Sequence, residues 1–156
     1  MDLKELYQEI VLDHGKNPRN KKKCKDFNKD AEGHNPLCGD KVHVFLKLNR
    51  EKKVEDISFE GEGCAISIAS ASIMTETIKG KEFNVAKKIL ENFLEMIKTG
   101  SKLRINSLTQ DENTTIMSLS GVKRFPMRVK CATLAWHTFM HAAEEKKETA
   151  NTEKAD

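Results

Sequence analysis

The stretch VHVFLKLNREKKVEDISFEGEGCAISIASASIM, residues 42–74, contains the change of pattern that decides the fold. Its first part has two runs of alternating apolar residues, 42–48 and 54–59, separated by a polar turn, and this arrangement predicts an antiparallel hairpin. Small and apolar residues then run from Ala65 to Ile78, and Gly80 suits the end of a helix. The stretch therefore predicts two strands followed by a largely buried helix.

Further elements are predicted on both sides of this stretch. Apolar residues recur at helical spacing from Asp2 to Leu12 and from Phe83 to Thr99, where Gly100 ends the pattern. Pro126 is well placed to begin a last helix, which continues toward Glu145. A short strand within residues 27–34 would give the sheet about three strands.

The length of 156 residues favours one domain, which we expect to cover residues 1–147. The segment 101–121 is polar and weakly periodic, so it is predicted to be an insertion rather than a core element. Residues 148–156 form a polar tail that is expected to be disordered.

The charge distribution argues against a polyanionic partner. Lys and Arg number 27 and Asp and Glu 24, and the lysine run in residues 21–25 is typical of a solvated loop, so no nucleic-acid binding is expected. The first ten residues contain Asp2, Glu5 and Glu9, which argues against a secretory signal. No apolar run approaches membrane-spanning length, and we expect a cytoplasmic protein that does not bind membranes.

The chemistry-bearing residues are cysteines at positions 24, 38, 64 and 131. Their wide spacing is unlike a disulfide framework, and no CxxC pair is present. Cys38-Gly39-Asp40 is expected to form a tight turn, and Cys64 to precede a helix whose free N–H groups favour a thiolate. Cys131 lies near the start of the last helix, so these three cysteines fall at element ends, where a thiolate could be exposed.

Three thiolates and the carboxylate of Asp40 would complete a four-ligand set for tetrahedral zinc, and thiolates also bind iron-sulfur clusters. Zinc in that set would carry a formal charge of about −2, which Arg128, one helical turn before Cys131, could offset. Isolated cysteines are more often small core residues than ligands, so spacing alone leaves a metal site and a buried core both open.

Other candidates are weaker. Cys24 is expected to be an exposed thiol in the lysine-rich loop. His137 and His141 have a spacing that can bind metal, but no third ligand accompanies them. His34 and His43 flank the Cys38 turn, and the sequence does not fix their direction.

Four motifs in order carry a resemblance to a known family: DHGKNPRN at 13–20, NPLCGDKV at 35–42, FEGEGCAISIASASIM at 59–74 and FPMRVKCATLAWHTF at 125–139. They resemble the SufU branch of the IscU-like, NifU N-terminal-like iron-sulfur cluster assembly proteins. In IscU proper a histidine precedes the third cysteine, whereas Lys130 stands here. The SufU branch has an arginine that matches Arg128 and an insertion that matches 101–121.

The resemblance implies an α+β domain with a small antiparallel sheet packed against several helices. It also implies a metal held by residues matching Cys38, Asp40, Cys64 and Cys131, with zinc as the metal of the SufU branch. Members of this branch act with a SufS-type cysteine desulfurase, whose histidine is thought to replace one zinc-bound thiolate. The position matching that thiolate is Cys38, which would then accept the outer sulfur of the persulfide.

Three functions follow as expectations. The first is a zinc-dependent sulfurtransferase, acting with its partner rather than as a free-standing enzyme, that passes sulfur to downstream iron-sulfur scaffold or acceptor proteins. The second is a scaffold on which a [2Fe-2S] cluster is assembled and transferred. The third is a structural zinc-binding interaction domain, whose role would survive replacement of Cys38.

Overall fold

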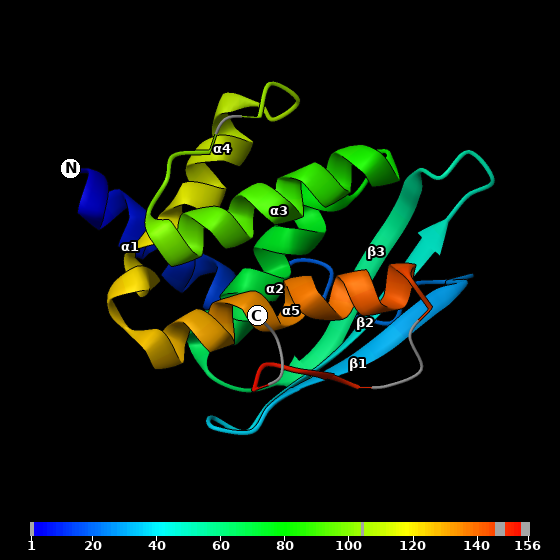
Figure 1. The fold of residues 1–156 in the computed structure, drawn as a ribbon, viewed down its shortest axis with the longest axis horizontal. Coiled ribbons are helices and arrows are strands. Elements are labelled where there is room, and N and C mark those ends of the chain that lie inside the picture. Colours follow the sequence, from blue (N-terminus) through cyan, green and yellow to red (C-terminus); the bar gives the residue numbers. More distant parts are fainter. Residues whose placement is uncertain (1, 104, 146–148, 154–156) are drawn as a thin grey trace.

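The fold is an α+β arrangement of five α-helices and one four-stranded sheet, on which α2 and α5 pack directly (Figure 1). It is taken from a computed structural model that describes residues 2–103, 105–145 and 149–153. In these ranges the elements are α1 Leu3–Lys16, β1 Lys29–Asn35, β2 Asp40–Leu48, β3 Val54–Glu62, α2 Ala65–Ile78, α3 Phe83–Thr99, α4 Gln110–Met117, the 3₁₀ helix η1 Ser118–Arg124, α5 Pro126–Ala143 and β4 Ala150–Asn151.

The sheet has the strand order β3-β2-β1-β4. The predicted hairpin is confirmed, because β2 and β3 pair antiparallel from Lys41↔Glu62 to Leu48↔Val54. The predicted third strand is β1, antiparallel to β2. The prediction of about three antiparallel strands is wrong in one respect, because β4 adds a fourth strand, parallel to β1. A two-residue strand has too short a pattern to be recognised from sequence.

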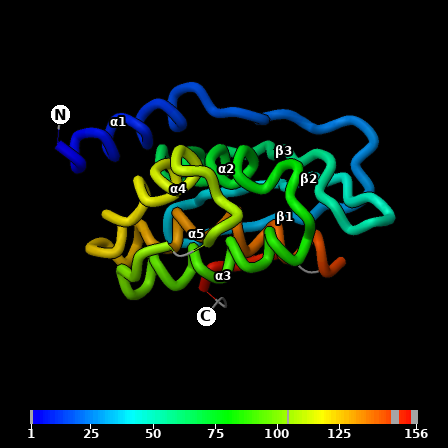
Figure 2. Tube along the Cα trace, turned by 90° about the horizontal axis from the view of Figure 1, so that it is seen from above, coloured from blue at the N-terminus to red at the C-terminus, as the bar shows by residue number. Residues whose placement is uncertain are grey.

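The helices cover one face of the sheet, and the segment between α1 and β1 covers part of the other, where the rings of Phe27 and Phe45 meet at 5.0 Å and Phe45 is buried. Figure 1 shows α5 running along β1 and β2, with α2 behind it and α3 outside. Helix α2 has no polar face, and ten of its residues are buried, as its run of small and apolar residues predicts. Figure 2 shows the chain after α1 passing along the side of the molecule opposite to α3.

The core lies between the sheet and these helices. Its largest fully buried side chains include Trp136, Phe59, Phe93 and Phe139. The rings of Phe93 and Trp136 stack with centroids 4.0 Å apart, and the Trp136 indole N–H donates to Ser70 Oγ at 2.9 Å. Helix α5 is thereby fixed against both α2 and α3.

Two expectations about the polar segments differ from the structure. Within 101–121, Ile116 and Leu119 are fully buried and belong to the core, so this part of the segment is not peripheral. In the expected disordered tail, Ala150 pairs with β1 and Thr152 is only 4% exposed. Residues 148 and 154–156 of that tail lie outside the described residues.

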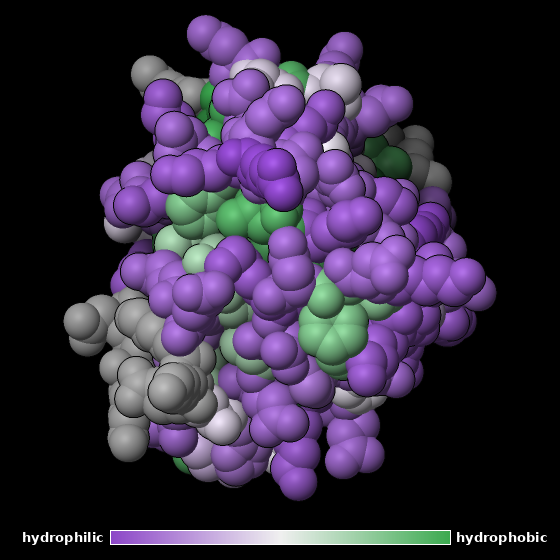
Figure 3. Space-filling view, turned by 90° about the vertical axis from the view of Figure 1, so that its right-hand side faces the viewer, coloured by the Kyte–Doolittle hydropathy of each residue, from purple (hydrophilic) through white to green (hydrophobic). Residues whose placement is uncertain are grey.

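The surface is mainly hydrophilic. The face drawn in Figure 3 shows apolar side chains only in small separate patches between polar ones. In the described ranges, no helix combines the length and the apolar character needed to cross a membrane.

Candidate metal centre

Three of the predicted ligands meet at one end of the sheet. The ligand atoms of Cys38, Asp40 and Cys131 all lie within 4.8 Å of one another, and this is the only such group of three or more found among the described residues. The Sγ atoms of Cys38 and Cys131 are 3.5 Å apart, although 93 positions separate them in the sequence. Folding has thus brought the β1–β2 turn against the first turns of α5.

Cys38 lies on the turn between β1 and β2 and is half-buried. Gly39 follows it with φ +71°, a left-handed conformation that favours glycine, as the expected tight turn requires. Leu37, the preceding residue, is 54% exposed. Cys38 is therefore the thiol that sits on an exposed turn rather than at the end of a packed helix.

Cys64 caps the N-terminus of α2, as the sequence predicts. Its thiol hydrogen-bonds with that of Cys131. Its Sγ does not, however, lie within 4.8 Å of all three ligand atoms of Cys38, Asp40 and Cys131. The hydrogen bond from Cys131 and the backbone N–H groups of Ile66 and Ser67 lower the pKa of Cys64 to about 6. The Cys64 thiol is accordingly ready to ionise near neutral pH.

Cys131 is fully buried on α5, so the expectation of an exposed thiolate fails at this position. Its hydrogen bond to Cys64 and its burial raise the pKa of Cys131, because both favour the protonated thiol. Arg128 lies one turn earlier, is exposed, and hydrogen-bonds to both thiols. The negative charge of Cys64 and the hydrogen bond to Cys131 raise the pKa of Arg128. The positive guanidinium in turn stabilises negative charge on the two cysteines.

Asp40 begins β2 and is fully buried, so its carboxylate needs hydrogen-bond partners. The backbone N–H of Cys64 donates to its Oδ1 at 2.9 Å. The side-chain amide of Asn35 donates to its Oδ2 at 3.1 Å and also to Cys131 Sγ at 3.5 Å. Asn35 is a site residue that sequence reasoning missed, although it begins the NPLCGD motif.

The remaining candidates lie elsewhere. Cys24 is only 3% exposed, with its backbone N–H bonded to Ser58 Oγ at 2.9 Å, so the expectation of an exposed thiol is wrong. His137 and His141 lie one turn apart on α5 and join no group of three candidate ligands in the described part of the chain.

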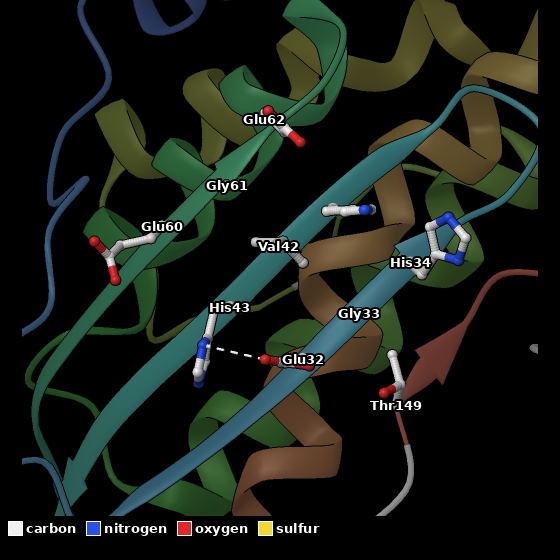
Figure 4. Close-up of a pocket in the computed structure, with 10 residues that line it drawn as sticks. Glu32, Gly33, His34, Val42, His43, Glu60, Gly61, Glu62 and Thr149 are labelled. Carbon is white, nitrogen blue, oxygen red and sulfur yellow. Dashed lines mark ion pairs between the residues drawn. The ribbon is translucent and has the colours of Figure 1, made fainter.

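His43 lies on the face of the sheet away from the helices, where its ring stacks on Phe45, rather than at the cysteines. Its Nε2 is 2.6 Å from Asp30 Oδ2 and its Nδ1 is 3.7 Å from Glu32 Oε1. Figure 4 shows His43, Glu32 and His34 lining a shallow pocket on this face, together with Glu60 and other residues. Both histidines that flank the Cys38 turn in sequence thus line a surface formed by the strands.

The donor chemistry at the cysteine cluster fits a metal ion. Sulfurs bound to tetrahedral zinc at about 2.3 Å lie about 3.8 Å apart, and the two Sγ atoms of Cys38 and Cys131 are 3.5 Å apart. The buried carboxylate and the nearby Arg128 suit a centre that would be negatively charged. A Cys/Asp/Cys group that could bind metal is therefore present, with Cys64 beside it.

Comparisons with known proteins identify the family. The model of the NifU-like N-terminal domain matches residues 6–132. The zinc-dependent sulfurtransferase SufU of Bacillus subtilis is 43% identical over 135 residues, which are 86% of this chain and 87% of that protein. The iron-sulfur cluster assembly scaffold protein IscU of Streptococcus pyogenes is 37% identical over 90% of this chain and 84% of that protein.

Solved structures agree with this assignment. A crystal structure described as an iron-sulfur cluster assembly scaffold protein for the SUF system from Fervidobacterium islandicum matches with a TM-score of 0.76 and 36% identity, over 88% of this chain and 96% of that one. A NifU-like N-terminal protein from Brucella abortus shares the fold, with a TM-score of 0.74 and 20% identity, over 94% of this chain and 99% of that one. The chain therefore belongs to the NifU-like N-terminal family of iron-sulfur cluster assembly proteins and resembles its SufU members over most of its length.

Proposed function

We propose that this chain is a zinc-dependent sulfur acceptor, which takes sulfur from a SufS-type cysteine desulfurase on Cys38 and passes it to downstream iron-sulfur scaffold or acceptor proteins. The observation that carries the proposal is the meeting of Cys38, Asp40 and Cys131 around a half-exposed turn. The name of the Bacillus subtilis relative supports zinc and sulfur transfer. Free thiols at all four cysteines suit a reducing compartment, so we place the reaction in the cytoplasm.

The metal would be held by Cys38, Asp40, Cys64 and Cys131, with Arg128 offsetting the charge of the ligand set. Bound zinc would keep the thiols ionised near neutral pH while reducing their nucleophilicity. Asp40, Cys64 and Cys131 are fixed by a strand and two helices, whereas Cys38 lies on a turn. Cys38 is therefore the ligand that can leave the set while the other three remain.

The transfer step is a thiol–persulfide exchange at Cys38. Its thiolate attacks the outer sulfur of the desulfurase persulfide, a new S–S bond forms at Cys38 Sγ, and the S–S bond in the partner breaks. The partner's cysteine leaves as a thiolate, so no external oxidant or reductant is needed. The exposed turn gives the partner's persulfide access, which a thiol at the position of Cys131 would not have.

A scaffold that assembles a [2Fe-2S] cluster is the second candidate. The Streptococcus pyogenes relative is named as a scaffold, and the same thiols and carboxylate could ligate iron. The two candidates differ in what the isolated chain carries. A sulfur acceptor holds near-stoichiometric zinc and stimulates the desulfurase, whereas a scaffold holds iron with sulfide and transfers the cluster to an acceptor.

The test is to purify the chain without added metal, measure zinc, iron and sulfide per chain, and measure alanine formation from cysteine by a SufS-type desulfurase. Zinc with strong stimulation supports the proposal. We expect Cys38→Ala to retain some metal and to reduce stimulation to the level of the desulfurase alone. Cys24→Ala is the matched control, since Cys24 is buried away from the cluster. Full stimulation by Cys38→Ala would remove Cys38 from the mechanism.

A further inference from the structure

The C-terminal segment 150–153 is attached beside the metal ligands at several points. Gly33 and His34 of β1 pair with Ala150 and Asn151 in parallel. The backbone N–H of Thr152 donates to the carbonyl of His34 at 3.2 Å. The segment is thus held along the strand that leads into the Cys38 turn, and it lies beyond residues 6–132, which match the family model.

A second attachment ties the same segment to the helix that carries Cys131. Lys130 Nζ donates to Glu153 Oε1 at 2.6 Å. Lys130 directly precedes Cys131 on α5, and the pair is partly exposed, so it contributes modestly by itself. Together with the strand pairing, it fixes Thr152 between β1 and α5.

Thr152 reaches the metal ligands through Asn35. Its hydroxyl donates to Asn35 Oδ1 at 3.0 Å, and the two residues are 4% and 0% exposed. With its oxygen engaged by Thr152, the Asn35 amide directs its NH₂ group to Asp40 Oδ2 and Cys131 Sγ. The reversed amide would turn its oxygen toward the Asp40 carboxylate, which is unfavourable in a buried site.

The hydrogen bonds form one chain from the C-terminal segment to two ligands. Asp40 is held at both oxygens, by Asn35 on one side and by the backbone of Cys64 on the other. Partners that orient ligands in this way tune metal affinity, and their loss typically costs about 10–100-fold. The hydroxyl of Thr152 is a link in this chain that can be removed with little change in side-chain volume, by substitution with valine.

We propose that Thr152 is a positioning residue which, through Asn35, orients Asp40 and Cys131, so that the C-terminal segment controls how firmly the metal is held. The inference rests on the metal site of the proposed function, but it concerns metal retention and not sulfur transfer. It applies equally to zinc and to another metal held by the same ligands.

The test compares Thr152→Val with Thr152→Ser in the full chain. Zinc release to a chromophoric chelator and the thiolate-to-metal absorption of the cobalt-loaded protein are measured. We expect Thr152→Val to release zinc faster, by up to about 10-fold because it acts on the ligands only through Asn35, and to alter the cobalt spectrum. Thr152→Ser keeps the hydroxyl and should restore both. Thr149→Val is the matched control, because Thr149 is exposed and directly precedes the segment 150–153.

Three results would overturn the proposal: equal zinc release from Thr152→Val and the unchanged chain, equal loss from Thr152→Ser and Thr152→Val, or no metal binding by the unchanged chain. The unfolding midpoint of each metal-free variant is measured in parallel. If all variants unfold alike without metal, a difference in zinc release arises at the ligands. A different result is that the variants release zinc at the expected rates while the unchanged chain does not stimulate a desulfurase. That result would refute the sulfur-acceptor function and leave this inference standing.

Discussion

At the scale of single residues, Gly63 packs tightly against Asp40, one of the proposed metal ligands. A Cβ at this position would meet Asp40 Oδ1, the atom that accepts the Cys64 N–H, at a distance that side chains do not tolerate. We expect Gly63→Ala to displace the carboxylate and weaken zinc binding by roughly 10-fold. Gly121→Ala, where a Cβ meets no atom within 4 Å, is the control. The measurement is zinc bound per chain against a competing chelator, and equal binding by both variants would contradict the expectation.

The ligand candidates could be found from sequence, but their supports could not. Cys38, Asp40 and Cys64 stand in short motifs whose chemistry and turn glycines are visible in the sequence. Thr152 is an ordinary threonine in a polar tail, and its role depends on a contact with Asn35 across 117 positions. Sequence patterns report periodicity and local chemistry, so they do not reveal a hydrogen bond between distant segments.

At the scale of elements, His14 joins α1 to α2 and makes this contact sensitive to pH. Its Nδ1 lies 2.7 Å from Ser72 Oγ, and burial, with Arg19 nearby, lowers the pKa of His14 from 6.5 to about 4. Asp13 opposes this shift, and Glu76 lies 3.9 Å from Nε2. The folded state therefore favours the neutral ring, whereas the unfolded chain binds a proton below pH 6.5.

Because the unfolded state binds more protons in this window, the free energy of unfolding should fall as the pH falls from about 6.5 to 4. The loss from His14 is about 3 kcal/mol at most. Denaturant unfolding at several pH values measures it. His14→Asn can keep the contact to Ser72 and does not titrate, so its stability should fall less steeply with acid. Parallel pH profiles for the two chains would rule His14 out as the cause.

Helix α3 was predictable because its apolar pattern is long, and the burial of the segment before α5 was not. Helix α3 spans the predicted Phe83–Thr99, with Gly100 in a left-handed conformation at its end. The segment 101–121 has few apolar residues, yet Leu119 is fully buried within the short helix η1. One apolar residue per turn over a short helix gives no periodic signal in the sequence. The burial of Leu119 depends instead on the packing of η1 against α3, which the sequence pattern does not reveal.

At the scale of the whole molecule, the proposed ligands come from parts of the chain that are held together by packing and by a few hydrogen bonds, such as that from the Cys64 N–H to Asp40. Cys38 lies on the β1–β2 turn, Asp40 begins β2, Cys64 precedes α2 and Cys131 lies on α5. These elements meet at one end of the sheet (Figure 1). A metal bound by all four would link the sheet to two helices. Because the unfolded chain does not preserve this arrangement, metal binding adds to the stability of the fold.

Metal removal should therefore lower the unfolding temperature. Free zinc at 1,000 times its dissociation constant would stabilise the folded chain by about 4 kcal/mol, which corresponds to roughly 10 °C for a chain of this size. Thermal unfolding with chelator and with zinc measures the difference. Cys131→Ala should abolish the zinc-dependent shift, even if its metal-free form is less stable, and Cys24→Ala should retain it. A shift of equal size in Cys131→Ala would mean that zinc stabilises the chain elsewhere, since Cys131 is the buried thiol that joins the turn to α5.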